Sequence, residues 1–301
     1  MPSDLTGQEY KLDDGSTVTF DKKVGEGDIC DCYEGTLRDY QPPVHKAGAT
    51  MWDILLEDDE GIPRAAFIKV AGNANNNDLV ERDFDALNQL FPPTEADEKF
   101  YRYLPRSKAK FKVGARQAHV LLRLDTYVSW ESVIQDYPKG IDYRDFAWML
   151  KRALVGVGFA HTRKVIHGAL LPSHIFLHPV DHGAKIIDWS YSVNEKLPLK
   201  AIVGDHRDYY SPEALDRQGL TPAADIYTLG KSAIRMLGGN VSTNELPDVV
   251  PASIKKLVTD MVQLQPRMRP GSAWDFHDEI TQEMKNLVGK PKFRPWPPPA
   301  V

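Results

Sequence analysis

The stretch at residues 167–174 reads HGALLPSH and runs directly into a short apolar segment, Ile175–Leu177. An Asp-His-Gly turn signal at residues 181–183 separates this segment from a second apolar run at residues 185–187, which leads into Asp188. Short β-branched and aliphatic runs on the two sides of such a turn predict a β-hairpin. The sequence thus places a histidine-containing loop before one short strand and an aspartate after the next.

Helical patterns surround this hairpin. Apolar residues recur at steps of three and four over residues 143–163, which predicts a long amphipathic helix before the hairpin. After the hairpin, helices are predicted at residues 224–237, 252–264 and 273–287. The last residues, 289–301, hold five prolines and predict an extended or polyproline tail rather than a packed element.

Strand patterns dominate the first part of the chain. β-branched and aromatic runs predict strands at residues 17–20, 29–37, 51–56, 65–70, 108–113 and 118–124. One helix is predicted among them, at residues 78–90. We therefore expect an α+β fold with a small β-rich lobe, a larger helical lobe and a Pro-rich tail. Their expected limits are residues 1–125, with an insertion around residues 38–64, then 126–288 and 289–301.

The composition of the 301 residues is that of an ordinary globular protein, with 42% hydrophobic and 26% charged residues. The formal charge is −5 and no long basic run is present, which argues against a nucleic-acid partner. No apolar stretch approaches the length of a membrane helix, so no membrane partner is expected. Residues 1–14 are too polar for a signal peptide. Two cysteines do not make a disulfide framework, and a reducing, cytoplasmic location is expected.

Two features of the first 90 residues suit the binding of a phosphate-containing ligand. Gly25-x-Gly27 lies between two strand patterns and not before a helix, which fits a hairpin loop over phosphates, or a plain turn, better than a dinucleotide fold. Lys69 lies inside an apolar strand, where a buried ammonium group needs a carboxylate partner. Glu81 and Asp83 on the following helix are both candidates, and two residues apart they cannot share a helix face.

The order of these features resembles the protein kinase superfamily: glycine hairpin, strand lysine, acidic helix, long helix, histidine loop, short hairpin and aspartate. Three later segments extend the resemblance. Residues 210–215, YSPEAL, resemble the Ala-Pro-Glu end of the activation segment, and residues 225–230, DIYTLG, resemble the start of the core helix of the large lobe. Residues 265–270, QPRMRP, resemble the segment that supplies an arginine partner to that glutamate. The resemblance covers residues 15–287 and implies a bilobal, Ser/Thr-kinase-like fold.

The resemblance also locates departures from the family, whose H-R-D-x-K-x-x-N loop supplies the catalytic groups. His167 matches the histidine, but Gly168 stands at the arginine position. Ala169 replaces the aspartate that accepts the substrate proton, Leu171 replaces the lysine, and His174 replaces the metal-binding asparagine. The resemblance therefore implies that no conventional catalytic residue is present, which is typical of a pseudokinase.

Other positions of the family are kept, and they imply a site for the cofactors ATP and Mg²⁺. The implied metal ligands are Asp188 and, at the asparagine position, His174. The implied cofactor-binding residues are Gly25, Gly27, Lys69, Glu81, Asp83 and Asp188.

Three substitutions bear on whether a nucleotide binds there. Phe67 faces the same side of its strand as Lys69, because side chains of a strand alternate, and it either stacks on a base or fills its pocket. Cys30 and Cys32 replace the third glycine of the loop and the valine that covers adenine in the family. With His45 the two cysteines suggest a metal site, although small hydrophobic strand residues are the simpler interpretation.

The resemblance implies structural roles for four residues, and His167 among them is expected to support the hairpin rather than take part in chemistry. Glu213 and Arg269 are expected to form a buried ion pair that braces the helical lobe, and Asp225 is expected to bind the backbone around His167. We therefore expect a regulatory or scaffolding pseudokinase with a protein partner. The alternatives are an atypical Ser/Thr kinase or nucleotidyl transferase that uses the retained lysine and aspartate, and an interaction module with a closed pocket.

Overall fold

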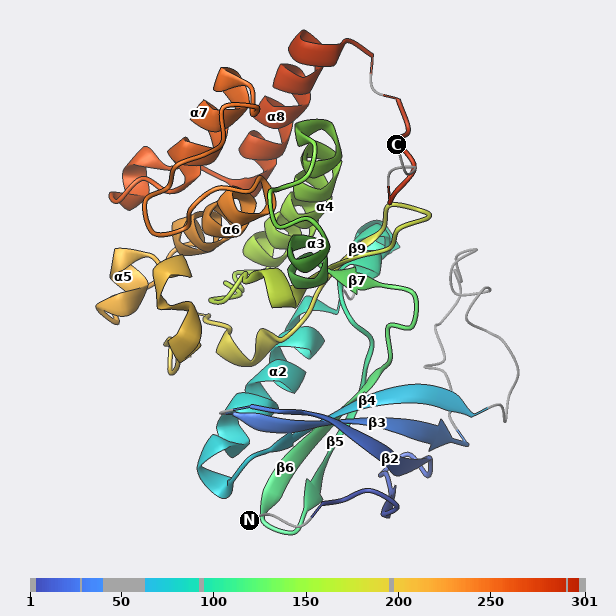
Figure 1. Ribbon diagram of the computed structural model, residues 1–301. Coiled ribbons are helices and arrows are strands. Elements are labelled where there is room, and N and C mark those ends of the chain that lie inside the picture. Colours follow the sequence, from blue (N-terminus) through green and yellow to red (C-terminus); the bar gives the residue numbers. More distant parts are fainter. Residues whose placement is uncertain are drawn as a thin grey trace. The chain divides into compact units, whose positions relative to one another are not determined.

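The computed structural model of the chain describes residues 4–27, 29–39, 63–91, 95–194, 198–290 and 292–297 (Figure 1). The chain divides into two compact units. The first comprises Met1–Glu98 and Pro105–Asp125 and is rich in strands, and the second comprises Lys99–Leu104 and Thr126–Val301 and is mainly helical. This is the α+β class that the sequence predicts. Among the described residues, no helix is long and apolar enough to cross a bilayer.

The first unit is built on a six-stranded antiparallel sheet with the order β1-β2-β3-β4-β6-β5. A single α-helix, α2, follows β4 in the described part of this unit and contacts β4, β5 and β6 (Figure 1). The bounds are β1 Glu9–Lys11, β2 Thr17–Glu26, β3 Cys30–Arg38, β4 Arg64–Ala71, α2 Asn77–Leu90, β5 Ser107–Val113 and β6 Arg116–Leu122, with a short 3₁₀ helix η1 at Ala74–Asn76.

Strand alternation gives this sheet two different faces. One face carries the apolar core of the unit, which includes Phe20, Tyr33 and Ile68 and is closed by Leu5 and Leu12 from the segments around β1. The residues between them, such as Lys69, point to the other face, which α2 covers. Buried and half-buried residues alternate along β3, and Phe67 and Lys69 of β4 lie on the side opposite Ile68, so strand alternation decides which side chains can line a site.

Most of the predicted strands are present with shifts of a few residues at their ends. The prediction of a turn at residues 25–27 is wrong for Gly25, because β2 continues through Gly25 and Glu26 and Gly25 pairs with Cys32. β1 was not predicted, since its three largely exposed residues carry no periodic signal. The predicted strand at residues 51–56, and most of the predicted insertion around residues 38–64, lie outside the described residues.

Six helices and a three-stranded antiparallel sheet, order β7-β8-β9, form the described part of the second unit. The helices are α3 Trp130–Asp136, α4 Tyr143–Thr162, α5 Pro212–Leu215, α6 Pro222–Met236, α7 Ala252–Met261 and α8 Ala273–Val288. The strands are β7 Val128–Ser129, β8 Ile175–Leu177 and β9 Ala184–Ile186. Short 3₁₀ helices of this unit are η3 Pro172–His174, η4 Trp189–Tyr191, η5 Gly204–Tyr209 and η6 Pro266–Met268, and η2 Glu95–Tyr103 contains residues of both units.

Local chemistry explains where these helices begin and end. The Asp142 side chain accepts a hydrogen bond from the Arg144 amide and so caps α4, and α6 starts two residues earlier than predicted because Pro222 suits the first helical turn. α7 ends three residues earlier than predicted. The carbonyl groups of Gln263 and Leu264 accept hydrogen bonds from a buried guanidinium group instead of continuing the helix.

The prediction of an unpacked tail is wrong for the described residues 292–297. Arg294 makes an ion pair with Asp145 of α4, and Trp296 is only 8% exposed. A proline-rich composition excludes regular helix but does not prevent anchoring by individual side chains. The tail therefore packs on the helical unit although it forms no helix or strand.

Candidate functional site

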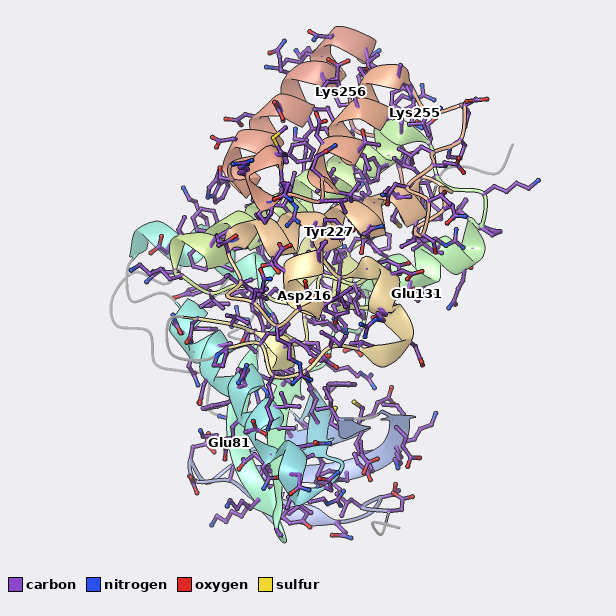
Figure 2. The ribbon with its side chains drawn as sticks, turned by 90° about the vertical axis from the view of Figure 1, so that its left-hand side faces the viewer. Glu81, Glu131, Asp216, Tyr227, Lys255 and Lys256 are labelled. Carbon is purple, nitrogen blue, oxygen red and sulfur yellow. The ribbon has the colours of Figure 1, made fainter. Side chains whose placement is uncertain are left out.

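Lys69 of β4 forms a buried ion pair with Asp83 of α2. Their Nζ and Oδ2 atoms are 3.3 Å apart, and the two side chains are 6% and 1% exposed. The structure therefore selects Asp83 over Glu81 as the partner of the lysine. Glu81 lies on the same helix (Figure 2), but two residues along a helix point about 200° apart, and Glu81 is half-buried at a different angle. Glu81 is a predicted site residue that the structure does not bring to the lysine.

His119 of β6 completes this cluster, although no motif in the sequence points to this residue. Its Nδ1 lies 2.8 Å from Asp83 Oδ2 and its Nε2 lies 2.8 Å from Ser107 Oγ. The ring is fully buried and is paired in register with Lys69. The ring therefore contacts Asp83 through one nitrogen and the Ser107 hydroxyl through the other. Lys69 and His119 both contact Asp83, which fixes the carboxylate beside the lysine.

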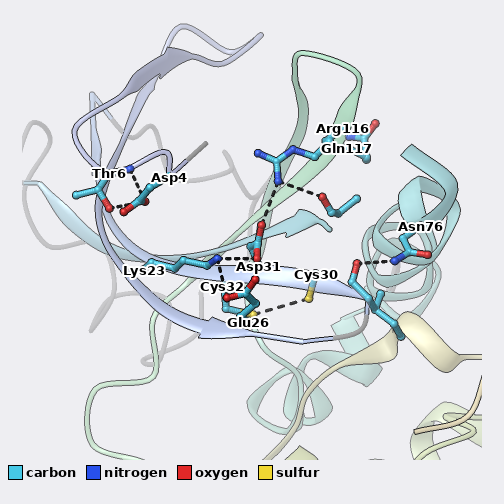
Figure 3. A network of polar contacts seen from close by, with 12 residues as sticks. Asp4, Thr6, Lys23, Glu26, Cys30, Asp31, Cys32, Asn76, Arg116 and Gln117 are labelled. Carbon is cyan, nitrogen blue, oxygen red and sulfur yellow. Dashed lines mark hydrogen bonds and ion pairs between the residues drawn. The ribbon is translucent and has the colours of Figure 1, made fainter. Parts of the chain in front are cut away.

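The hairpin that carries Gly25 and Gly27 is tied to its neighbours by polar contacts (Figure 3). Asp31, which is nearly fully buried, accepts from Lys23 Nζ at 2.9 Å and from Arg116 at 3.1 Å. The Ile29 carbonyl accepts from the Gly72 amide and from the Asn76 side chain. The start of β3 is therefore attached to the connection between β4 and α2 and to the first residue of β6.

Cys32 and Phe67 share the sheet face of Lys69. Cys32 is paired in register with Lys69, and Phe67 lies two residues before it on β4. Cys30 and Cys32 are both half-buried, with their Sγ atoms 3.8 Å apart. No group of three or more His, Cys, Asp or Glu side chains that could hold a metal occurs within the described ranges, and the predicted third partner, His45, lies outside them.

In the second unit, Asp225 at the start of α6 organises the loop that the sequence singled out. Its carboxylate accepts from the backbone amides of His167 and Gly168 and from Nε2 of His161, each at 2.8 Å. Burial alone would raise the pKa of Asp225. The hydrogen bond from His161 and the groups of the loop lower it by more than burial raises it, so the pKa of Asp225 lies below its usual range. The predicted contact with the loop backbone is confirmed, and His161 is an additional partner.

His167 has the structural role that the sequence predicts. Its Nε2 donates to the Ile187 carbonyl at 2.8 Å, and its Nδ1 accepts from the Ala169 amide at 3.2 Å. These two contacts require the neutral ring. Burial lowers the pKa of His167 to about 4, which keeps the ring neutral near neutral pH. The ring also packs edge-on against Trp189.

The three positions that follow Gly168 hold no group for proton or phosphate chemistry. The side chains of Ala169, Leu170 and Leu171 are all fully buried. The Ala169 carbonyl accepts from the Leu171 amide and from Nδ1 of His174, both at 2.8 Å. The loop is thus well ordered by its backbone, while its side chains are part of the core.

Gly168 has a conformation that only glycine fits. Its φ is +79°, and a Cβ atom there would lie 2.4 Å from the Tyr191 carbonyl oxygen. An arginine at this position would meet the same backbone. The glycine is therefore part of how this loop packs, not simply the loss of an arginine.

We expect Gly168→Ala to lower the free energy of unfolding more than a matched glycine substitution does. Gly114 also has a positive φ, +59°, but nothing lies within 4 Å of a Cβ there. In both variants the left-handed backbone conformation costs the alanine about 1–2 kcal/mol. Only in Gly168→Ala does the overlap with the Tyr191 carbonyl add a further cost of roughly 1–3 kcal/mol. Urea unfolding of the two variants measures the difference. Equal losses would show that the loop moves away freely.

The structure brings together His174 and Asp188, the two predicted metal ligands. Nδ1 of His174 donates to the Ala169 carbonyl, so its Nε2 points to Asp188 Oδ2, 3.2 Å away. Asp188 has a left-handed backbone conformation, φ 61° and ψ 65°, which is uncommon for a residue other than glycine. An imidazole nitrogen and a carboxylate oxygen that face each other can share a proton or a divalent cation.

The predicted ion pair between Glu213 and Arg269 is confirmed. The guanidinium group binds both carboxylate oxygens and also donates to the carbonyls of Gln263, Ala223 and Leu264. The Arg269 side chain is fully buried. Burial alone would raise the pKa of Glu213. The hydrogen bonds and the charge of Arg269 outweigh this effect, so the pKa of Glu213 lies below its usual value. This pair fastens α5 to the segment before α8.

Comparison with known proteins agrees with this arrangement. The family model described as "Protein kinase domain" matches residues 115–290, which is more than half of the chain. The chain therefore belongs to the protein kinase family. It is 34% identical over 97 residues to mitogen-activated protein kinase kinase kinase 8 of Rattus norvegicus, and 23% identical over 150 residues to dual specificity protein kinase zak2 of Dictyostelium discoideum. These matches cover 32% and 46% of this chain, but only 20% and 23% of the two relatives.

Solved structures support the fold. The kinase domain of PknI from Mycobacterium tuberculosis, solved as a mutant, is similar with a TM-score of 0.63. The similarity covers 94% of this chain and 99% of that one, with 14% sequence identity. At this identity the likeness concerns the protein kinase fold alone.

Proposed function

We propose that this chain is a pseudokinase: it keeps the frame of the protein kinase fold, does not carry out conventional phosphotransfer, and acts as a regulatory or scaffolding protein through a protein partner. The observation that carries this proposal is the loop from His167 to His174. Asp225 and His167 hold its backbone in place, while Ala169 and Leu171 at the positions of the base and the lysine are fully buried apolar side chains.

The chemical consequence follows from the groups that are missing. A methyl group cannot accept the proton of a substrate hydroxyl, and an isobutyl group cannot neutralise the charge of a phosphoryl group in transfer. A positioned base alone contributes about 10²–10⁴-fold to the rate of such reactions. Because Ala169 is enclosed by protein, a nearby water molecule is not readily placed there as a substitute base.

The same chain keeps groups that support nucleotide binding. The buried pair of Lys69 and Asp83 resembles the lysine–glutamate pair that active kinases require. Asp188 and His174 fit a divalent cation, since Mg²⁺ in such sites takes one or two protein ligands and completes its shell with phosphates and water. When bound, the ion would neutralise phosphate charge. The histidine is the less suitable of the two ligands, because imidazole prefers later transition metals.

The first test measures phosphate transfer by the full chain. With Mg²⁺ and ATP labelled at the γ-phosphate, we expect no incorporation into the protein itself or into a general protein substrate above the level of Lys69→Met. Incorporation by the wild-type chain that this variant abolishes would contradict the proposal.

The second test measures nucleotide binding separately from catalysis. We expect ATP with Mg²⁺ to raise the unfolding temperature of the wild-type chain, since a ligand at about 100 times its Kd stabilises by about 2.7 kcal/mol. The shift should be lost in Lys69→Met and reduced in Asp188→Asn, with each variant compared with itself without ligand. No shift in the wild-type chain would favour a site closed by Phe67.

A second candidate function is an atypical kinase or a nucleotidyl transferase. The intact Lys69–Asp83 pair favours it, because positioning and electrostatics supply most of the catalysis of phosphoryl transfer. Intact-mass measurement after incubation with Mg-ATP distinguishes the two, since a phosphoryl group and a nucleotidyl group add different masses. An unmodified mass supports the pseudokinase.

A further inference from the structure

The tail residues 292–297 lie against a part of the helical unit that takes no part in the kinase-like site. They run beside the turn between β8 and β9 (Figure 1). Within this segment three side chains make the contacts, and all three fall in the four residues Phe293-Arg294-Pro295-Trp296. The segment has no helix or strand of its own. Its attachment therefore depends on a short linear sequence.

The central contact is a bidentate ion pair. Arg294 Nε and one terminal guanidinium nitrogen lie 2.6 and 3.0 Å from the two carboxylate oxygens of Asp145. The Asp145 side chain is 2% exposed, and that of Arg294 is 33% exposed. Asp145 is in the first turn of α4, where the helix dipole stabilises a negative charge. A planar guanidinium group fits a carboxylate in this geometry better than a lysine ammonium group does.

Aromatic rings provide the contacts on the two sides of the arginine. Trp148 of α4 and His182 of the β8–β9 turn are stacked with ring centroids 3.8 Å apart and an angle of 5°. Phe293 stacks on His182 at 4.3 Å and 20°, and it remains 68% exposed. Trp296 is only 8% exposed and lies 5.3 Å from the ring of Tyr137.

We infer that Tyr137, Asp145, Trp148 and His182 form a peptide-binding site for an aromatic–arginine–x–tryptophan sequence, which the tail of this chain occupies in cis. The site is built from the end of α3, from α4 and from the β8–β9 turn, and all of its ligand contacts come from one linear tetrapeptide. The partner that fits it is a protein segment with the same sequence pattern, because only an arginine between two aromatic residues satisfies the buried carboxylate and both ring surfaces together. This inference is independent of the proposed pseudokinase function.

The tail then acts as an intramolecular competitor of such a partner. A short tether holds a ligand at an effective concentration of about millimolar, and only residues 289–291 separate the end of α8 from Lys292. A partner sequence therefore binds the intact chain more weakly than it binds a chain whose tail has been released. The exposed Phe293 ring and the partly exposed guanidinium group are where displacement can begin.

The experiment uses a fluorescein-labelled peptide with the sequence of residues 292–297, KFRPWP, and the full-length chain. Tail release is produced by the triple variant Phe293→Ala, Arg294→Ala and Trp296→Ala, whose changes lie outside the helices and strands. By fluorescence anisotropy we expect saturable binding to this variant and at least tenfold weaker binding to the wild-type chain. A peptide with neutral citrulline at the arginine position should bind at least tenfold more weakly to the released variant.

Asp145→Asn in the released background tests the site itself and should reduce peptide affinity at least tenfold. Thermal unfolding verifies that this variant folds, and Arg294→Gln alone, a change confined to the tail, replaces the triple variant if needed. The inference is overturned by absence of saturable binding to the released chain, by equal affinity for the released and wild-type chains, or by equal binding of the citrulline peptide.

Discussion

Glu213→Gln is expected to lower the free energy of unfolding by about 3–5 kcal/mol, the usual cost of removing one partner of a buried ion pair. The Arg269 side chain is fully buried, and its charge would lose its only described anionic partner. The carbonyls of Gln263, Ala223 and Leu264 would still accept hydrogen bonds from it, but they do not neutralise it. Denaturant unfolding monitored by tryptophan fluorescence measures the change.

A surface pair provides the matched control. Lys256 and Asp260 form an i,i+4 pair on α7, and the Lys256 side chain is 75% exposed (Figure 2). Asp260→Asn should leave the unfolding midpoint unchanged, because exposed pairs contribute little to stability. The double variant Glu213→Leu with Arg269→Met should be more stable than Glu213→Gln, since it removes the buried charge. A small loss in Glu213→Gln would mean that water reaches the guanidinium group.

The features that the sequence predicted well depend on local patterns. The ends of α4 and α8 fall within one residue of the predicted limits. Apolar residues at steps of three and four lie on one face of a helix, so the extent of this pattern in the sequence marks the extent of the helix. The pair of Glu213 and Arg269 was expected from two segments that resemble the same family. In both cases the necessary information lies within short stretches of sequence or in their order.

The features that were missed depend on how separate strands meet or on backbone conformation. His119 reaches Asp83 only because β4 and β6 are paired in a register that places it beside Lys69. The choice between Asp83 and Glu81 depends on the rotation of α2 about its axis. The positive φ of Gly168 and its contact with Tyr191 follow from the packing of two loops. None of these is encoded in the periodicity of a single segment.

The tail illustrates a different difficulty. Its proline content correctly indicated the absence of helix and strand over residues 292–297, but composition says nothing of specific anchors. Arg294 finds its partner 149 residues earlier in the chain. Such a contact could be predicted only from knowledge that Asp145 is a buried carboxylate at the start of a helix.

Stability should fall on acidification because of His167, and by more than in a variant that lacks this ring. Burial lowers the pKa of His167 from 6.5 to about 4, so protons bind the unfolded chain more readily than the folded one. The contribution of the neutral ring is therefore complete above about pH 6.5 and is lost as the pH falls towards 4. At 1.36 kcal/mol for each pKa unit, the loss is about 3 kcal/mol.

The matched variant is His167→Gln, which can still donate to the Ile187 carbonyl but does not titrate. It should be less stable than the wild-type chain at pH 7, because it loses the packing of the imidazole on Trp189. Its free energy of unfolding should then fall less steeply between pH 6.5 and 4, so that the two curves converge by about 3 kcal/mol. Burial also lowers the pKa of His182. Because His182 is present in both proteins, its contribution to the pH dependence of stability is the same in both and cancels in the comparison. Parallel curves would show that the ring is protonated without unfolding, and that water or Asp225 stabilises the imidazolium ion in the folded loop.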